Sequence, residues 1–295
     1  MILNEFDVLQ LLKSKLIAAS QVNGLRLTDK DFGSLRWKDS EKSVFYLKDY
    51  RNNLFETPNA DIELGTGVDA VRSSAAMIYN LLGEKSIVLD RKEYTGIEYE
   101  KTFPAIIDEK GDSHEAHLDA VFYSSDNSEM YAVEAKLLEW KDSPKNLAEA
   151  YLDIDKYFTS GKESLTFIDF FRTLILNKQN KDGRYRHRAK RYDAIQMTIH
   201  TLALYNYFSQ KASKDVKKLT LLNVVWKYDS DEYTTEEQEA SQFIQEANDR
   251  FVPLFKQIGI DFSIQYSSFQ DFKKRIDFSN DQKRLEYLNR YEVIA

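Results

Sequence analysis

Three charged residues stand inside two short apolar runs near the middle of the chain. Asp119 lies in the run 117–123, and Glu134 and Lys136 lie in the run 130–138. The six residues between the two runs are polar and have the composition of a hairpin turn. Because side chains alternate between the faces of a strand, Glu134 and Lys136 share one face, and a hairpin can lay Asp119 beside it. Charged groups are costly to bury in apolar strands unless they bind something, so chemistry is expected here.

The pattern resembles the PD-(D/E)XK nuclease superfamily, which has the restriction-endonuclease-like fold. In that superfamily an Asp, an Asp or Glu, and a Lys project from adjacent strands and hold a divalent metal ion and a water. An acid two residues before a lysine occurs at six other places in this chain, but only Glu134 and Lys136 lie in an aliphatic strand that follows an Asp-bearing strand. Leu118 stands where the motif has its proline, which lowers the specificity of the match and leaves the charged residues unchanged. The alternative is a surface ion pair on an edge strand.

The resemblance implies a Mg²⁺- or Mn²⁺-dependent phosphodiesterase, either an endonuclease or an exonuclease. Carboxylate oxygens suit these cations, which acidify a bound water and polarise a phosphate. We expect Asp119 and Glu134 to be metal ligands, with the backbone carbonyl of Ala135 as a third. Lys136 is expected to orient the attacking water and to offset negative charge. Since two acids in one site repel each other, alanine at either acid should abolish cleavage and leave the protein folded.

A glutamine lies in the helix expected after the lysine strand. Related families often place a glutamine there, and Gln196 resembles that residue, with His200 one helical turn further along. The resemblance implies a catalytic role for Gln196, and the alternative is a polar residue on the solvent face of an amphipathic helix. Asp69 is the only acid available in the first predicted helix of the nuclease region. The remaining histidines have no spacing typical of a zinc site.

A cationic cluster follows, although the chain as a whole is acidic. The net charge is −7, yet residues 181–191 carry six cationic side chains and a histidine. The local field determines where phosphates bind, so beside a metal site this cluster is expected to bind the phosphates of DNA. A solvated basic loop is the alternative. The expected nucleic-acid-binding residues are Arg184, Arg186, Arg188, Lys190 and Arg191.

The composition is that of a packed globular protein. The chain has 295 residues, 42% of them hydrophobic, and only 10 Gly and 4 Pro leave little room for flexible linkers. It contains no cysteine, which excludes disulfides and thiolate zinc sites and fits a reducing cytoplasm. The N-terminus carries acids early, unlike a signal peptide, and no apolar run approaches the ~20 residues of a membrane span. We therefore expect a cytoplasmic protein without a membrane partner.

The hydrophobic pattern predicts a mixed α/β fold. The predicted helices are 4–20, 67–82, 146–177, 192–205, 236–258 and 281–291. The predicted strands are 96–107, 115–123, 131–138, 219–226 and 262–266. The run 219–226 is apolar almost throughout, as expected for a strand buried on both faces. The order helix, three strands, helix, strand is the restriction-endonuclease-like αβββαβ core that the resemblance implies, with a mixed sheet flanked by helices.

We expect a helical or irregular extension at 1–66 and a nuclease domain at 67–295, with a helical insert at about 141–180; one compact domain is the alternative. Residues 71–82 also resemble the first helix of an uncharacterised bacterial branch of the superfamily. The function expected is a Mg²⁺-dependent nuclease acting on DNA in restriction, repair or phage defence. The alternatives are a catalytically inactive relative that binds nucleic acid or a protein partner, and an α/β enzyme with a small-molecule pocket. The sequence does not distinguish DNA from RNA as the substrate, or a monomer from a homodimer.

Overall fold

The structure of the chain is a computed structural model. It describes residues 27–28, 36–37, 74–83, 85–107, 113–137, 139, 144–159, 161–179, 183–210, 215–227 and 230–291. The predicted helix 4–20, the boundary at residue 66 and Asp69 lie outside these residues. Among the residues described, no helix is both long and apolar enough to cross a membrane.

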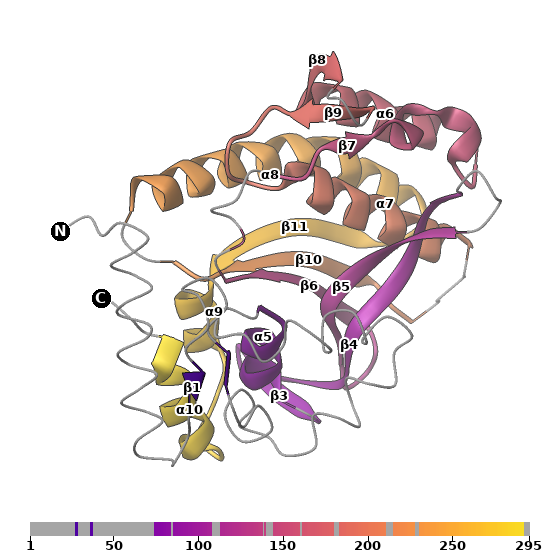
Figure 1. Ribbon diagram of the computed structural model, residues 1–295. Coiled ribbons are helices and arrows are strands. Elements are labelled where there is room, and N and C mark those ends of the chain that lie inside the picture. Colours follow the sequence, from indigo (N-terminus) through magenta and orange to yellow (C-terminus); the bar gives the residue numbers. More distant parts are fainter. Residues whose placement is uncertain are drawn as a thin grey trace.

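A six-stranded mixed sheet forms the centre of the molecule (Figure 1). Its strands follow the spatial order β11-β10-β6-β5-β4-β3. The meander from β3 to β6 is antiparallel, whereas β10 runs parallel to both β6 and β11. Parallel neighbours cannot be joined by a tight turn, so a long crossover must connect β6 to β10. The strands are β3 Ser86–Leu89, β4 Lys92–Ile107, β5 Ser113–Ser124, β6 Glu129–Lys136, β10 Lys218–Val225 and β11 Asp261–Ser268.

Helices cover both faces of this sheet (Figure 1). The long helices α7 and α8 pack on one face, and the shorter helices α5, α9 and α10 pack on the other. Each face has its own apolar core: Ala132 of β6 lies in the core beneath α7, and its neighbour Val133 lies in the core beneath α5. The helices are α5 Ser74–Leu82, α7 Ala194–Gln210, α8 Asp231–Gln257, α9 Phe269–Arg275 and α10 Gln282–Leu288, followed by the 3-10 turn η4 Asn289–Tyr291.

The predicted α/β class is confirmed, and the elements that frame the charged residues lie where the pattern places them. The strands expected at 96–107, 115–123 and 131–138 are β4, β5 and β6, and those at 219–226 and 262–266 are β10 and β11. The prediction omits β3, with four residues, and α9, with seven. Both are too short for a periodic pattern to reveal them.

The predicted helix 146–177 and the helical insert around it are wrong in part. Among the described residues of this stretch, two 3-10 turns precede one α-helix, α6 Lys162–Leu174. Asp153 explains the break, because its carboxylate accepts a hydrogen bond from Asp155 N at 3.1 Å, and such local bonds compete with helix formation. Short strands flank these helices and form a three-stranded sheet, so the expected basic loop is partly strand (Figure 1). The elements are β7 Leu147–Ala148, η2 Glu149–Leu152, η3 Ile154–Lys156, β8 Ile175–Gln179 and β9 Arg184–His187.

Candidate active site

The three charged residues that the sequence singles out lie on one face of the sheet. Asp119 is on β5, and Glu134 and Lys136 are on β6. The ladder between these strands pairs Ala120 with Val133, so one step further in the same register Asp119 stands opposite Glu134. Val121 of β5 and Ala132 of β6, each two positions from one of the acids, pack in the core beneath α7 and α8. The charged side chains therefore face the layer that contains α7.

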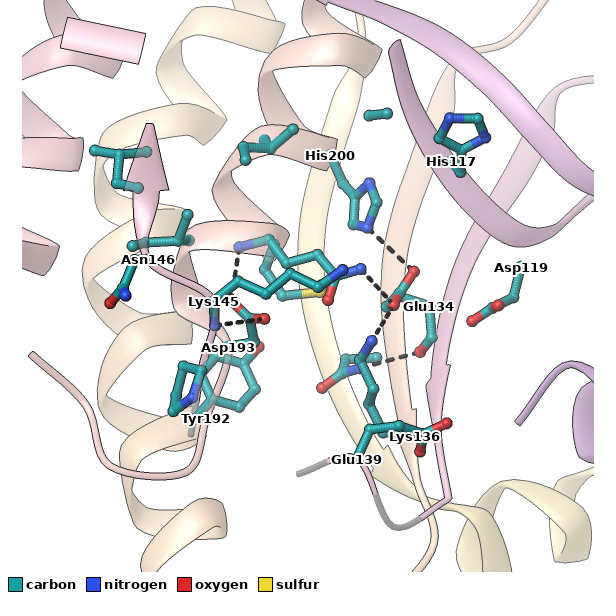
Figure 2. Close-up of a pocket in the computed structure, with 18 of the residues that line it drawn as sticks. His117, Asp119, Glu134, Lys136, Glu139, Lys145, Asn146, Tyr192, Asp193 and His200 are labelled. Atoms are coloured by element: carbon teal, nitrogen blue, oxygen red, sulfur yellow. Dashed lines mark hydrogen bonds and ion pairs between the residues drawn. The ribbon is translucent and has the colours of Figure 1, made fainter. Parts of the chain in front are cut away.

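A cavity of about 690 Å³ lies at these residues. Strands β4 and β5 line one side of it, and residues 144–148, β9 and the start of α7 line the other. Figure 2 shows Lys145 on one side of Glu134, and His117 and Asp119 on the other. A polar cavity of this size is large enough to hold a small organic ligand or one part of a larger one.

Glu134 is held by groups from both β6 and α7. Lys136 Nζ lies 2.7 Å from Glu134 Oε1, and Gln196 Nε2 donates a hydrogen bond to the same oxygen at 2.8 Å. His200 Nε2 lies 3.1 Å from Oε2, and Figure 2 draws these contacts as dashed lines. Only 4% of Glu134 is exposed. A carboxylate buried to this degree requires such partners, because desolvation alone would disfavour its charge.

Two side chains fix the backbone of β6 at the same place. Asn223 of β10 pairs with Glu134 in the parallel ladder, and its Nδ2 donates to the Glu134 carbonyl at 3.0 Å. Ala135 N donates to Asp119 Oδ2 at 2.5 Å, beyond the point where the ladder between β5 and β6 ends. The Asp119 carboxylate thus takes the place of the backbone carbonyl that would accept this hydrogen bond if the ladder continued. Ala135, whose carbonyl is the third expected metal ligand, also lines the cavity.

The two carboxylates have opposite pKa shifts. Burial raises the pKa of Asp119 well above its usual value, and the nearby charge of Glu134 raises it further. Burial acts on Glu134 in the same sense, but Lys136 and His200 outweigh it and lower the pKa of Glu134 to about 2. Burial opposes the charge of Lys136, yet the surrounding carboxylates, Glu134 foremost, raise the pKa of Lys136 above its ordinary value. Lys136 is therefore a fixed positive charge and is unsuited to act as a general base.

The donor set suits a hard divalent cation that is held partly by its substrate. Within the described part of the chain, no three His, Asp or Glu side chains are grouped so that they could hold a metal ion by themselves. Mg²⁺ often takes only one or two carboxylates and completes its shell with waters and substrate phosphates, a requirement that Asp119 and Glu134 meet. Gln196 Oε1 adds a buried oxygen that has no hydrogen-bond partner among the described residues. These donors fit Mg²⁺ or Mn²⁺.

The predicted phosphate-binding residues divide into two groups. Arg184 and Arg191 line the cavity. Three others lie outside its lining: Arg186, Arg188 and Lys190. Lys181, at the start of the predicted cluster, is outside the described residues. The structure therefore brings part of the cluster to the candidate site and directs the rest elsewhere.

Glu239 of α8 fixes the backbone that carries Arg191. One carboxylate oxygen accepts a hydrogen bond from Lys190 N at 2.8 Å, and the other accepts from Arg191 N at 2.9 Å and Tyr192 N at 3.0 Å. Three backbone donors bound to one carboxylate give a rigid approach to α7. The place of Arg191 in the cavity wall is thus set by a residue that the sequence pattern does not mark.

Two buried residues in the wall are not predicted by the sequence. Tyr192 is 2% exposed, and its hydroxyl has no hydrogen-bond partner in the described part of the chain. Glu236 of α8 is 1% exposed and accepts a hydrogen bond from the Tyr266 hydroxyl at 2.6 Å. Burial raises the pKa of Glu236 to about 8. No sequence signal marks either residue, because such side chains are common in amphipathic helices and beside them.

Asn223 and His200 carry weak sequence signals. Asn223 is a polar amide in the otherwise apolar run 219–226, the kind of exception that marks a functional or structural contact. His200 follows Gln196 by one helical turn, so the two residues point the same way. Gln196 itself points at Glu134, as its expected role requires.

Comparisons with protein-family models, with curated proteins and with solved structures find no match for the chain. No relative therefore supplies a function by similarity. The assignment depends on the cavity, on the residues that line it and on the order of the elements that carry them.

Proposed function

We propose that the protein is a nuclease that uses Mg²⁺ or Mn²⁺ to hydrolyse phosphodiester bonds in DNA. The observation that carries this proposal is the placement of Asp119, Glu134 and Lys136 together on one sheet face, at a polar cavity. Two carboxylates and an ammonium in such a place can hold a divalent cation and a phosphate together. A structural ion pair alone would account for Glu134 and Lys136. It would leave Asp119 with only its hydrogen bond from Ala135 N, a contact that does not require a carboxylate.

The order of the elements supports the same proposal. Helix α5, strands β4 to β6, helix α7 and the parallel strand β10 come in the order of the αβββαβ core that the PD-(D/E)XK resemblance implies, with β3 added before β4 and the segment from β7 to β9 inserted before α7. In that core the charged residues come from the second and third strands, which here are β5 and β6. A fold can host many functions, so this agreement adds to the argument from the residues and does not replace it.

Each residue has a distinct part in the proposed reaction. Asp119 and Glu134 would hold the cation, which when bound acidifies a water and polarises the phosphate. Lys136 places its charge beside Glu134 and offsets the negative charge that develops on the phosphate. From α7, Gln196 and His200 hold the Glu134 carboxylate and so fix the direction of its oxygens.

A catalytically inactive relative is the second candidate. Both oxygens of Glu134 already have partners in the protein, since Lys136 and Gln196 contact one and His200 lies beside the other. If these contacts persisted, Glu134 would contribute little to cation binding. Such a protein would bind nucleic acid or a protein partner and cut nothing.

An activity assay on the full-length chain separates these candidates. Supercoiled plasmid, linear duplex and single-stranded DNA are incubated with Mg²⁺ or Mn²⁺, with EDTA as the control. We expect cleavage that requires the cation and disappears in Asp119→Asn. Glu286→Gln changes an exposed carboxylate on α10 and should cut like the parent. Cleavage that persists in EDTA, or in Asp119→Asn, would contradict the proposal.

Binding of Mn²⁺ alone, followed by electron paramagnetic resonance, gives a readout independent of cleavage. The nuclease should bind Mn²⁺, and Asp119→Asn should bind it more weakly. An inactive relative should neither cut DNA nor change its Mn²⁺ affinity when Asp119 is replaced.

A further inference from the structure

We propose that the cavity receives one unpaired DNA strand and excludes an intact duplex. This inference rests on the proposed nuclease function and adds the form of its substrate. The burial of the candidate site, the charge on each wall of the cavity and the rings in its lining all favour a single strand.

The charged side chains at the centre of the site are largely buried. The Glu134 side chain is 5% exposed and that of Lys136 is 19% exposed. Walls rise on two sides, from β4 and β5 and from the segment around Lys145 (Figure 2). Duplex DNA is a stiff cylinder, so its phosphates reach Glu134 only if the whole cylinder enters between these walls. An unpaired strand is flexible, and only its own backbone has to enter.

One wall is cationic. Lys145 lies two residues before the strand β7, and Arg184 of β9 pairs with Ala148 across the β7–β9 ladder. Arg191 leads into α7, and all three cations line the cavity. Cations on one wall can neutralise the phosphates of one DNA strand that runs along it.

The opposite wall is acidic. Glu115, His117 and Asp119 occupy alternate positions of β5 and share one face of the strand. The β4–β5 ladder pairs the residues on either side of Glu100 with those on either side of Asp119, so Glu100 lies opposite Asp119. A cation at Asp119 would leave the exposed carboxylate of Glu115 on the same face. That carboxylate would repel the phosphates of a second strand and so select against a duplex.

Rings in the lining give unpaired bases a surface on which to stack. His114 is exposed, and its ring lies 6.1 Å from that of Tyr151 in an edge-on arrangement. His117 is a second exposed ring on the same strand, and all three residues line the cavity. Tyr151 is 4% exposed and packs against the ring of His114, so the two histidine rings are the ones open to a base. Bases inside a duplex have both faces covered by their neighbours, so these two rings serve only a strand whose bases are unpaired.

Fluorescence anisotropy on the full-length protein, with Ca²⁺ in place of Mg²⁺, tests the inference. A labelled single-stranded oligonucleotide is compared with a duplex of the same sequence whose ends are closed by hairpin loops. We expect the single strand to bind at least tenfold more tightly. Equal or tighter binding of the closed duplex would overturn the inference, and if that duplex were also cut, the nuclease proposal would still stand. Failure to bind or cut either DNA would overturn both.

Charge variants assign the effect to the two walls. Lys145→Glu should weaken single-strand binding several-fold and flatten the slope of log affinity against log salt by up to ~0.7, because one phosphate is no longer neutralised. Lys162→Glu, at an exposed cation on α6, is its matched control. Glu115→Gln should tighten duplex binding and so reduce the preference for the single strand over the duplex. Glu286→Gln should change neither duplex binding nor this preference. If Lys145→Glu and Glu115→Gln both keep the preference of the parent and melt at its temperature, the walls do not select the strand and the inference fails.

Discussion

Asp119 and Glu134 face each other across neighbouring strands, yet their surroundings move their pKa values in opposite directions. Glu134 has the Lys136 ammonium and a histidine within 3.1 Å, whereas among the described residues Asp119 accepts a hydrogen bond from the backbone N–H of Ala135. A carboxyl group whose pKa is raised beside one whose pKa is lowered can take a different part in the same reaction. Glu134 therefore ionises at a lower pH than Asp119.

This difference predicts unequal effects of substitution on stability. Glu134→Ala leaves Lys136 buried without its closest partner, so the free energy of unfolding should fall by roughly 3 kcal/mol. Asp119→Asn keeps an oxygen for the Ala135 N–H and removes a charge that its surroundings disfavour. The free energy of unfolding of this variant should hold or rise. Urea denaturation at neutral pH measures both, and neither variant should cut DNA.

The structure around Glu134 corrects an expectation drawn from the sequence, namely that removing either acid only relieves repulsion. Glu134 also balances Lys136 and accepts a hydrogen bond from α7, which no local pattern reveals. If Glu134→Ala were as stable as the parent, the ion pair with Lys136 would make no net contribution to the free energy of unfolding. If Asp119→Asn were strongly destabilised, Asp119 would be a structural residue.

The raised pKa of Glu236 predicts that the stability of the protein depends on pH. Its pKa is about 8 in the folded protein, against 4.5 as its ordinary value, so folding favours the protonated form. Its contribution to the free energy of unfolding is complete below pH 4.5 and is lost as the pH rises through 8, at up to ~1.4 kcal/mol per pH unit. Denaturant titrations between pH 4.5 and 9 should show this fall in the parent.

Glu236→Gln should remove that fall, because an amide keeps an oxygen for the Tyr266 hydroxyl and cannot ionise. The variant should therefore be more stable than the parent at pH 9 and similar to it at low pH. Glu286→Gln, on the surface, should follow the parent at every pH. Parallel curves for the parent and Glu236→Gln would show that Glu236 ionises normally in the folded state.

At the scale of the elements, β9 and the start of α7 decide which cations reach the cavity. Arg184 and Arg191 line it, whereas Arg186 and Arg188 do not, although all four lie in one short stretch of sequence. Arg184 and Arg186 share one face of β9 by strand alternation, so it is their different positions along the strand that separate them. The hydrogen bonds of Glu239 to the following backbone fix Arg191. The basic residues are therefore contiguous in the sequence, but the fold divides them between the cavity lining and positions outside it.

Paired substitutions test this division. Replacing Arg184 and Arg191 together by alanine should weaken DNA binding and flatten the slope of log affinity against log salt by up to ~0.9 for each phosphate contact with duplex DNA, or ~0.7 with a single strand. Replacing Arg186 and Arg188 removes the same charge and should change the slope less. Filter binding across a range of salt concentrations measures both pairs. Equal slopes for the two pairs would mean that only net charge matters.

For the whole molecule, the sequence predicts the part of the fold that long apolar runs encode. The pattern locates β4, β5, β6, β10 and α7, and the family resemblance adds that Gln196 should approach the charged strands. It does not predict Tyr192 or Glu236, because their place in the cavity depends on how α8 packs over α7 and not on local periodicity. The insert departs from the prediction as well, since a single Asx turn and short strands replace part of the expected helix.

The position of β10 between β6 and the edge strand β11 has a consequence for the order in which the site forms. Hairpin β5–β6 closes over a turn of four residues, whereas Gln196 and Asn223, which complete the setting of Glu134, lie 62 and 89 residues further along. Closing long loops costs conformational entropy before any contact forms, so such pairings are slow. Until β10 arrives, β6 presents an open apolar edge to which another chain can add a strand. A chain that misassembles at this stage would keep most of its secondary structure and never build its site.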